Sequence, residues 1–163
     1  MKNIIIVRHA KSSWSDFSLS DFNRPLDKRG IHDAPFMAQK LKELGYKPDH
    51  IFTSDAVRAK TTAQSFQLLF DVPMTEVHSL YHGDPEDYLD VLRELDNDLG
   101  TVALFGHNPG ITYIANLILP GVTENIPTCG IIIAKFESQS WDAVNWKELH
   151  LQKILVPKEI FND

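Results

Sequence analysis

The stretch Ile4-Ile5-Ile6-Val7-Arg8-His9-Ala10 decides the fold of this 163-residue chain, because it joins a strand to an arginine and a histidine. Four consecutive apolar, β-branched residues are typical of a strand that is covered on both faces, as in a parallel sheet between helices. Arg8 and His9 come where this strand ends. In open α/β sheets, ligands bind at the carboxyl ends of the strands. The sequence therefore predicts a site at this edge of the sheet.

Two later strands end in a similar way. The apolar run Thr101 to Phe105 leads into Gly106-His107-Asn108-Pro109-Gly110, and the short strand 51–53 is followed by Arg58. Arg58 falls in the first turn of a helix predicted over 56–70. A helix N-terminus offers free N–H groups to an anion, and arginine adds a planar fork that matches phosphate oxygens. We therefore expect four side chains around one anion site: Arg8, His9, Arg58 and His107.

Strands and helices alternate along most of the chain, which predicts a parallel or mostly parallel sheet with helices on both faces. The helices are expected over 33–44, 56–70, 85–95 and 109–119, and the remaining strands over 73–77, 131–136 and, at an edge, 146–155. Residues 11–29 are polar and lack a sustained period, so we expect a functional loop. Its aromatic residues either shape an access groove or pack on the core: Trp14, Phe17 and Phe22.

The composition predicts one globular domain over residues 1–163, with 43% hydrophobic and 23% charged residues. The formal net charge of -6 argues against a general nucleic-acid surface. The single cysteine, Cys129, excludes an internal disulfide and is expected to be a buried small side chain. No run approaches the length of a membrane span, and the N-terminus does not resemble a signal peptide. We therefore expect a cytoplasmic protein.

The residues at the strand ends favour phosphoryl transfer. A neutral histidine attacks phosphorus through one ring nitrogen when a hydrogen bond holds the other. Arginines and a second histidine then supply positioning and charge stabilisation, which is most of what the reaction requires. Taken singly, Arg8, Arg58 and His107 fit surface or turn positions about as well. Metal binding by His9 and His107 is disfavoured, because the adjacent arginines would repel a cation.

These motifs together resemble those of the histidine phosphatase superfamily, also called the phosphoglycerate mutase-like family. Arg8-His9-Ala10 resembles its Arg-His-Gly motif, and Thr53 to Ala63 resembles its signature of Ser, then Arg-Ala, then Thr-Ala. Gly106 to Gly110 is similar to a third motif, and Arg24-Pro25-Leu26 with Arg29-Gly30 is similar to a Leu-x-x-x-Gly segment. The short length and the Arg-His-Ala variant are most similar to the phosphohistidine phosphatase, SixA-like branch.

The resemblance implies a three-layer α/β/α sandwich with a mostly parallel central sheet and an antiparallel edge strand. It implies that His9 is the phosphorylated nucleophile and that no metal or other cofactor is needed. The phosphate pocket would be formed by Arg8, Arg58 and His107. Many relatives have an asparagine six residues after the nucleophile, where this chain has Ser15. We expect Ser15 to be a shorter phosphate-binding donor.

The largest departure from the family concerns the proton donor. Larger relatives have a glutamate after the third strand, in a Leu-x-Glu context, whereas Leu80-Tyr81 is followed by His82 and, two residues on, Asp84. His82 or Asp84 could donate a proton, although Asp84 also suits the N-cap of the next helix. General acids matter most for poor leaving groups, and a protonated phosphohistidine already has a good one. A weak or absent acid therefore favours cleavage of a P–N bond.

These patterns predict a phosphatase that hydrolyses phosphohistidine in a protein, or a similar activated phosphate, through a phospho-His9 intermediate. Hydrolysis of a small phosphorylated metabolite by the same route is an alternative. A non-catalytic phosphate-binding module is a third reading, which the complete set of nucleophile and donors disfavours. The expected partner is a phosphorylated protein or small substrate, not a nucleic acid or a membrane, and no pattern indicates an oligomeric state.

Overall fold

A six-stranded sheet forms the centre of the computed structural model, which describes residues 1–157. The strands are β1 (Lys2–Arg8), β2 (His50–Thr53), β3 (Met74–Glu76), β4 (Thr101–Gly106), β5 (Ile131–Phe136) and β6 (His150–Leu155), in the order β3-β2-β4-β1-β5-β6. The first four pair in parallel, which confirms the mostly parallel sheet. The edge strand β6 pairs antiparallel with β5, as expected. Strand β5, which lies next to this edge strand, runs antiparallel to both of its neighbours, β1 and β6.

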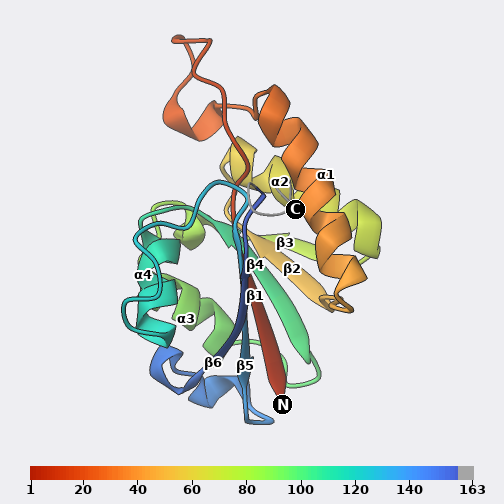
Figure 1. Ribbon diagram of the computed structural model, residues 1–163, viewed down its shortest axis with the longest axis vertical. Coiled ribbons are helices and arrows are strands. Elements are labelled where there is room, and N and C mark those ends of the chain that lie inside the picture. Colours follow the sequence, from red (N-terminus) through yellow and green to blue (C-terminus); the bar gives the residue numbers. More distant parts are fainter. Residues whose placement is uncertain (158–163) are drawn as a thin grey trace.

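Helices cover both faces of the sheet (Figure 1). They are α1 (Lys28–Glu43), α2 (Val57–Phe70), α3 (Pro85–Arg93) and α4 (Gly110–Ile118). Successive side chains of β1 point to opposite faces. Ile5 and Val7 therefore pack in one core with residues of α1 and α2, whereas Ile4 and Ile6 pack in a second core with residues of α3 and α4. The predicted three-layer sandwich is confirmed, and the two cores explain the unbroken apolar run.

Two elements begin four or five residues away from the start that the sequence predicts. Helix α1 begins at Lys28 instead of residue 33, because the Asp27 carboxylate caps it by accepting a hydrogen bond from the Gly30 N–H at 2.9 Å. The regularly spaced apolar residues, from which the sequence predicts the helix, only begin at Ala34. Strand β6 begins four residues late, because Trp146 lies in a 3-10 turn and its indole N–H donates to the Pro85 carbonyl at 3.0 Å.

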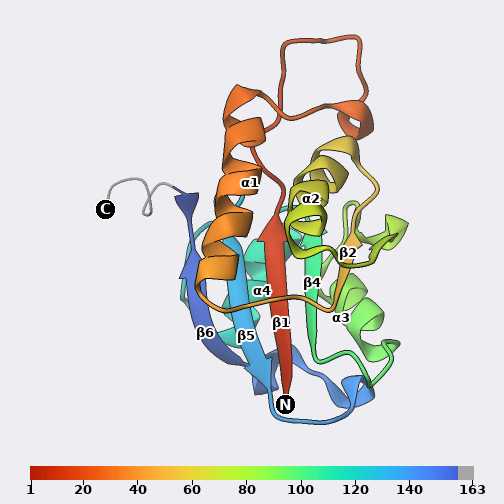
Figure 2. The ribbon, with the colours of Figure 1, turned by 90° about the vertical axis from the view of Figure 1, so that its right-hand side faces the viewer.

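The chain between β1 and α1, residues 9–27, forms a loop that projects beyond the carboxyl ends of the strands (Figure 2). Pairing between Ser12 and Leu26 closes its base, and the 3-10 turn η1 (Asp21–Asn23) lies on its returning arm. Trp14 and Phe17 are 65% and 92% exposed, so they do not pack on the core. The predicted long loop is confirmed, and we refer to it as the β1–α1 loop.

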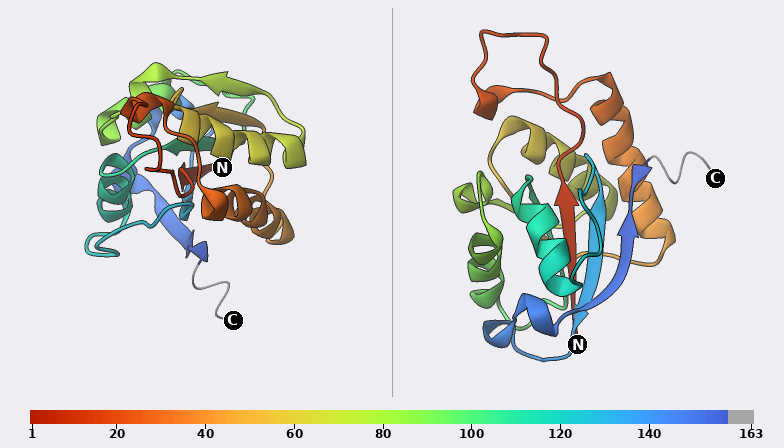
Figure 3. Two further views of the ribbon diagram at one scale, coloured as in Figure 1. Left: turned by 90° about the horizontal axis from the view of Figure 1, so that it is seen from above. Right: turned by 60° about the vertical axis from the view of Figure 1, so that its left-hand side comes forward.

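Backbone hydrogen bonds hold the ends of β1, β2 and β4 side by side. The His9 N–H donates to the Gly106 carbonyl at 3.0 Å, and the Ser54 N–H donates to the Phe105 carbonyl at 2.9 Å. The right-hand view of Figure 3 shows β1 ending directly below the projecting loop. Within residues 1–157, no helix is both long and apolar enough to cross a bilayer.

Candidate active site

His9 directly follows β1 and is 7% exposed. Its Nδ1 lies 2.7 Å from the carbonyl oxygen of Ala10. Because a carbonyl oxygen only accepts, this contact places the ring proton on Nδ1 and leaves the lone pair on Nε2. His9 also lines a pocket of about 170 Å³ at the base of the β1–α1 loop. The ring is thus held in the tautomer that attack through Nε2 requires.

The charge state of His9 suits the same role. Burial lowers the pKa of His9 to about 3, and the positive charges of Arg58, Arg8 and Arg24 lower it as well, while the hydrogen bond to Ala10 acts in the opposite direction. At neutral pH the imidazole is therefore uncharged. An uncharged ring keeps the lone pair with which a nucleophile attacks.

Arg8 reaches the same pocket as His9, although adjacent residues of a strand point to opposite faces. The chain leaves the strand at this point, and Arg8 donates from Nη1 to the carbonyl oxygen of Ile126 at 2.9 Å. Its Nε is buried without a hydrogen-bond partner among the described residues. A buried, unused donor is costly, and such groups call for a functional explanation. An anion in the pocket provides one.

Arg58 lies in the first turn of α2, as the sequence predicts, and lines the same pocket. It is 6% exposed. Its guanidinium group is bound by a residue of the β1–α1 loop, since Nη1 donates to the Asp21 carbonyl oxygen at 2.6 Å and Nη2 donates to Asp21 Oδ2 at 3.0 Å. Arg24 and Lys11 also line the pocket, so four cationic side chains surround it.

His107 follows β4, and its ring centroid lies 5.2 Å from that of His9. Its Nε2 lies 2.8 Å from Ser54 Oγ, whereas Nδ1 is buried without a hydrogen-bond partner in the described residues. Burial lowers the pKa of His107 to about 3, with further contributions from His9 and Arg58. His107 is therefore a neutral imidazole beside His9.

The glycine before His107 has a clear structural reason. A Cβ at Gly106 would overlap the hydroxyl group of Tyr88 from α3. That hydroxyl accepts a hydrogen bond from the backbone N–H of His107 at 3.1 Å. The absence of a side chain at Gly106 therefore allows Tyr88 to approach closely and to fix the backbone of His107.

Ala10 stands where the family usually has glycine. Its side chain is fully buried and packs in the core beneath α1 and α2. Its N–H donates to Thr62 Oγ1 at 2.9 Å. The extra methyl group therefore lies in the core, and this departure leaves the pocket open.

The structure does not bring Ser15 into the pocket. Ser15 is exposed, and its Oγ lies 2.8 Å from Ser13 Oγ. Ser12 lines the pocket instead and accepts a hydrogen bond from Arg24 Nη2. The irregular course of the loop after residue 12 separates these serines, and no sequence period indicates which of them faces inward.

The two candidate proton donors have other positions. The Asp84 carboxylate accepts a hydrogen bond from the Asp87 N–H at 3.0 Å and forms a reciprocal capping box at the start of α3. His82 is exposed, with a backbone φ of 60°, and its ring centroid lies 4.0 Å from that of Tyr81. Neither residue is among those lining the pocket with His9, and His107 is not among them either; besides burial, the charge of His82 helps to lower the pKa of His107.

Sequence reasoning missed Asp21 and Tyr81 as site residues. Asp21 accepts hydrogen bonds from Arg58, and Tyr81 donates its hydroxyl hydrogen to Asp21 Oδ2 at 2.7 Å. The only signal in the sequence is the spacing of Asp21 and Arg24, three residues apart. This spacing places them together within a short turn, where they form an ion pair at 3.0 Å.

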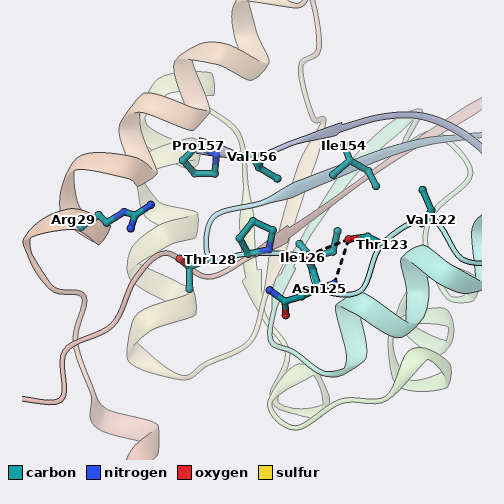
Figure 4. A pocket seen from close by; sticks show the side chains of 10 residues that line it. Arg29, Val122, Thr123, Asn125, Ile126, Thr128, Ile154, Val156 and Pro157 are labelled. Carbon is teal, nitrogen blue, oxygen red and sulfur yellow. Dashed lines mark hydrogen bonds between the residues drawn. The ribbon is translucent and has the colours of Figure 1, made fainter. Parts of the chain in front are cut away.

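A second pocket, of about 460 Å³, lies beside the first and shares Thr128 with it (Figure 4). It is larger, but its lining is mainly apolar and includes Ile126, Ile154 and Val156. Arg29 is the charged residue on its wall. The smaller pocket has His9 and the convergent cations, so it is the candidate active site.

Comparisons with known proteins agree with this fold and these motifs. A sequence profile of the histidine phosphatase superfamily (branch 1) matches residues 4–84. An uncharacterized chloroplastic protein of Arabidopsis thaliana is 35% identical over 152 residues, which cover 86% of this chain and 69% of that protein.

Solved structures share the fold over nearly the whole chain. A protein of Agrobacterium tumefaciens, provisionally assigned as the phosphohistidine phosphatase SixA, has a TM-score of 0.82 and 24% identity, covering 96% of this chain and 98% of that one. The protein histidine phosphatase SixA in complex with tungstate has a TM-score of 0.79 and 22% identity, covering 97% and 99%.

The order of the motifs, the sheet topology and these similarities define the class of protein. The chain belongs to the histidine phosphatase superfamily. Its three-layer fold is phosphoglycerate mutase-like and, within the superfamily, is similar to the fold of the SixA phosphohistidine phosphatases. Membership of this superfamily supports a phosphatase activity.

Proposed function

We propose that this protein is a phosphatase that hydrolyses phosphohistidine in a protein substrate through a covalent phospho-His9 intermediate. One observation carries the proposal. The Ala10 carbonyl oxygen holds Nδ1 of a neutral His9, which lines a pocket together with Arg8 and Arg58. A neutral nucleophile among fixed cations is the arrangement that phosphoryl transfer requires.

The reaction proceeds in two displacements. His9 Nε2 attacks phosphorus, the P–N bond of the substrate breaks, and its electron pair leaves with the substrate imidazole. A water oxygen then attacks the phospho-His9 phosphorus, the P–Nε2 bond breaks, and inorganic phosphate leaves with His9 neutral again. Arg8 and Arg58 stabilise charge on the phosphoryl oxygens in both steps.

The size of the pocket supports a macromolecular substrate. A volume of about 170 Å³ lies below the range of roughly 300–1,000 Å³ typical of small-molecule sites. It suits a phosphoryl group with its leaving group outside. Trp14, which lines the pocket, is 65% exposed, and Phe17 is 92% exposed farther out on the same loop. These aromatic side chains offer a contact surface to a protein that carries the phosphoryl group.

The positions of the two candidate proton donors support an activated phosphate as the substrate. Asp84 is used in the capping box of α3, and His82 is exposed with its ring beside that of Tyr81. Without a strong general acid, a leaving group that departs easily is favoured. A phosphohistidine protonated on its free ring nitrogen leaves as neutral imidazole, whereas an alkyl phosphate ester requires a proton.

A small phosphorylated metabolite is the alternative substrate, and one observation favours it. The pocket of about 460 Å³ borders the catalytic pocket at Thr128, and its size is that of a small-molecule site. A metabolite with its phosphoryl group at His9 would place its remaining part there.

The test measures phosphate release from a phosphohistidine protein, from free phosphohistidine and from an aryl phosphate, with wild type and His9→Ala. The proposal expects the highest kcat/KM for the phosphohistidine protein and loss of all activity in His9→Ala. Equal release by both forms would refute the covalent mechanism. Higher kcat/KM for small phosphate esters would favour the metabolite alternative. Phosphate binding without turnover of any substrate would indicate a binding module.

A further inference from the structure

We infer that Asp21 is a positioning residue of the phosphate pocket, whose carboxylate and backbone carbonyl hold Arg58 and Arg24 in the orientation that receives a phosphoryl group. The inference rests on the proposed function, because it concerns the same pocket. It gives a role to the returning arm of the β1–α1 loop, which binds Arg58 through this residue.

Asp21 binds Arg58 in a way that fixes the plane of the guanidinium group. The backbone carbonyl oxygen accepts from Nη1 at 2.6 Å, and Oδ2 accepts from Nη2 at 3.0 Å. Two contacts from one residue define both the position and the tilt of a planar group. Guanidinium has five N–H donors, and Asp21 takes up two of them. Asp21 therefore orients Arg58 without using up its binding capacity.

The same carboxylate joins Arg58 to Arg24. Asp21 Oδ1 accepts from Arg24 Nη1 at 3.0 Å, so the two oxygens bind one arginine each. Arg24 is further fixed by a hydrogen bond from Nε to the Ser13 carbonyl oxygen at 3.0 Å, and it lies 3.2 Å from the centroid of the Trp14 ring. Arg24 is thereby fixed on the wall of the pocket.

The charge of Asp21 allows these cations to stand close together. Arg8, Arg24 and Arg58 line one pocket of about 170 Å³, where like charges repel. Asp21 offsets part of that repulsion from the rim, where its side chain is 44% exposed. Without the negative charge of Asp21, the repulsion between the arginines would move them apart. They would then bind one phosphate group less tightly.

Tyr81 completes the arrangement. Its hydroxyl group donates to Asp21 Oδ2 at 2.7 Å, and its ring meets the His107 ring edge-on at a centroid distance of 5.5 Å. Tyr81 thus connects the loop carboxylate to the second histidine of the site. Loss of the hydroxyl removes one restraint on Asp21 and leaves its charge in place.

The ionisation of Asp21 is consistent with positioning and not with acid catalysis. Desolvation acts to raise the pKa of its carboxyl group, but hydrogen bonds from Tyr81 and Arg58 and the charge of Arg58 outweigh it, so the pKa lies below its usual value. An ionised carboxylate has no proton to donate. It keeps the negative charge that holds two arginines.

The experiment compares Asp21→Asn, Tyr81→Phe and the matched control Asp16→Asn. Asp16 lies on the same loop, and its carboxylate accepts hydrogen bonds from the backbone N–H and the hydroxyl group of Ser18. Calorimetry measures the affinity for orthophosphate and vanadate, and kinetics with an aryl phosphate separate KM from kcat. Thermal unfolding establishes that each variant is folded.

We expect Asp21→Asn to weaken phosphate binding about tenfold, as loss of a hydrogen bond to a charged group predicts. KM should rise by a similar factor while kcat changes less. Tyr81→Phe should weaken binding by a smaller factor, and Asp16→Asn should leave it unchanged. Unchanged or tighter phosphate binding in folded Asp21→Asn would overturn the inference, because Asp21 would then be idle or would compete with the ligand.

The second variant and the binding measurement each provide an independent test of the role of Asp21. If Asp21→Asn does not fold, Tyr81→Phe carries the test, and unchanged phosphate affinity in that variant overturns the inference. Phosphate binding needs no turnover. A wild type that binds phosphate and releases none from any substrate would refute the proposed function, while the role of Asp21 would still be decided by the binding data.

Discussion

The rings of His9 and His107 lie 5.2 Å apart between centroids, at the carboxyl ends of the neighbouring strands β1 and β4. Burial is the main reason that the pKa of each lies at about 3. Two neutral imidazoles can stand beside Arg8 and Arg58, whereas two imidazolium groups would add to their repulsion. The pair is therefore stable in the charge state that the reaction needs.

This charge state predicts a pH dependence of stability. In the unfolded chain both histidines protonate near pH 6.5, whereas in the folded protein they do so near pH 3. Between these values the unfolded state binds more protons, so the free energy of unfolding falls as the pH is lowered from 6.5 toward 3. Urea unfolding at pH 7, 5.5 and 4.5 measures this fall. We expect a smaller fall in His107→Gln, and equal falls would contradict the assigned pKa of His107.

The structure brings together the candidate residues that the sequence analysis chose at strand ends. His9, Arg58 and His107 each follow an apolar strand, and parallel strands bring such positions to one edge whatever the details of packing. The same regularity predicts the alternation of strands and helices, whereas the burial of Cys129 is predicted from the usual place of a lone cysteine and is confirmed. Local sequence patterns are sufficient to predict these positions, because a parallel sheet brings the carboxyl ends of its strands to one edge.

The residues that the sequence did not identify lie where no period applies. Asp21 and Tyr81 are 60 positions apart and meet through a loop and a short turn. The family resemblance predicts that Ser15 binds phosphate, but the loop turns so that Ser12 lines the pocket. Such contacts depend on the tertiary path of irregular segments, which neither spacing nor hydrophobicity specifies.

Replacement of Arg58 by alanine tests the pocket directly. The change removes a charge-assisted contact to phosphoryl oxygens, worth about 1.5–3 kcal/mol. Vanadate affinity should therefore fall by roughly 10- to 150-fold. Arg93→Ala is the matched control, because Arg93 lies on α3 and binds Glu86 and the Val144 carbonyl outside the pocket. Equal vanadate affinity in wild type and Arg58→Ala would remove Arg58 from the site.

Ser12 and Ser15 form a matched pair for the course of the loop. Ser12 Oγ accepts a hydrogen bond from Arg24 and is 8% exposed, whereas Ser15 is exposed and bonds to Ser13. We expect Ser12→Ala to raise the KM for an aryl phosphate several-fold, since Arg24 loses a restraint. Ser15→Ala should leave KM unchanged. A larger effect in Ser15→Ala would restore the role that its sequence position suggests.

The contact between Gly106 and Tyr88 predicts coupled stability changes. A methyl group at position 106 meets the Tyr88 hydroxyl, so Gly106→Ala should lower the free energy of unfolding by about 1–3 kcal/mol. In a Tyr88→Phe background the same change should cost less, because the closest atom is gone. A double-mutant cycle by urea unfolding measures the difference. Additive effects would mean that the clash is relieved by another movement.

The exposed aromatic side chain of Phe17 separates the two substrate classes. Phe17 is 92% exposed on the β1–α1 loop and does not line the catalytic pocket. If the leaving group is a protein, Phe17→Ser should lower kcat/KM for a phosphohistidine protein by roughly 5- to 150-fold, since a buried aromatic contact is worth about 1–3 kcal/mol. The rate with an aryl phosphate should not change, because the small leaving group does not reach Phe17.

Leu68→Ser is the control variant, since Leu68 is an 86% exposed apolar residue near the C-terminal end of α2. Equal kcat/KM for the phosphoprotein in wild type and Phe17→Ser would show that this aromatic side chain takes no part in substrate recognition, and the pocket beside Thr128 would then be the better place to look for the leaving group.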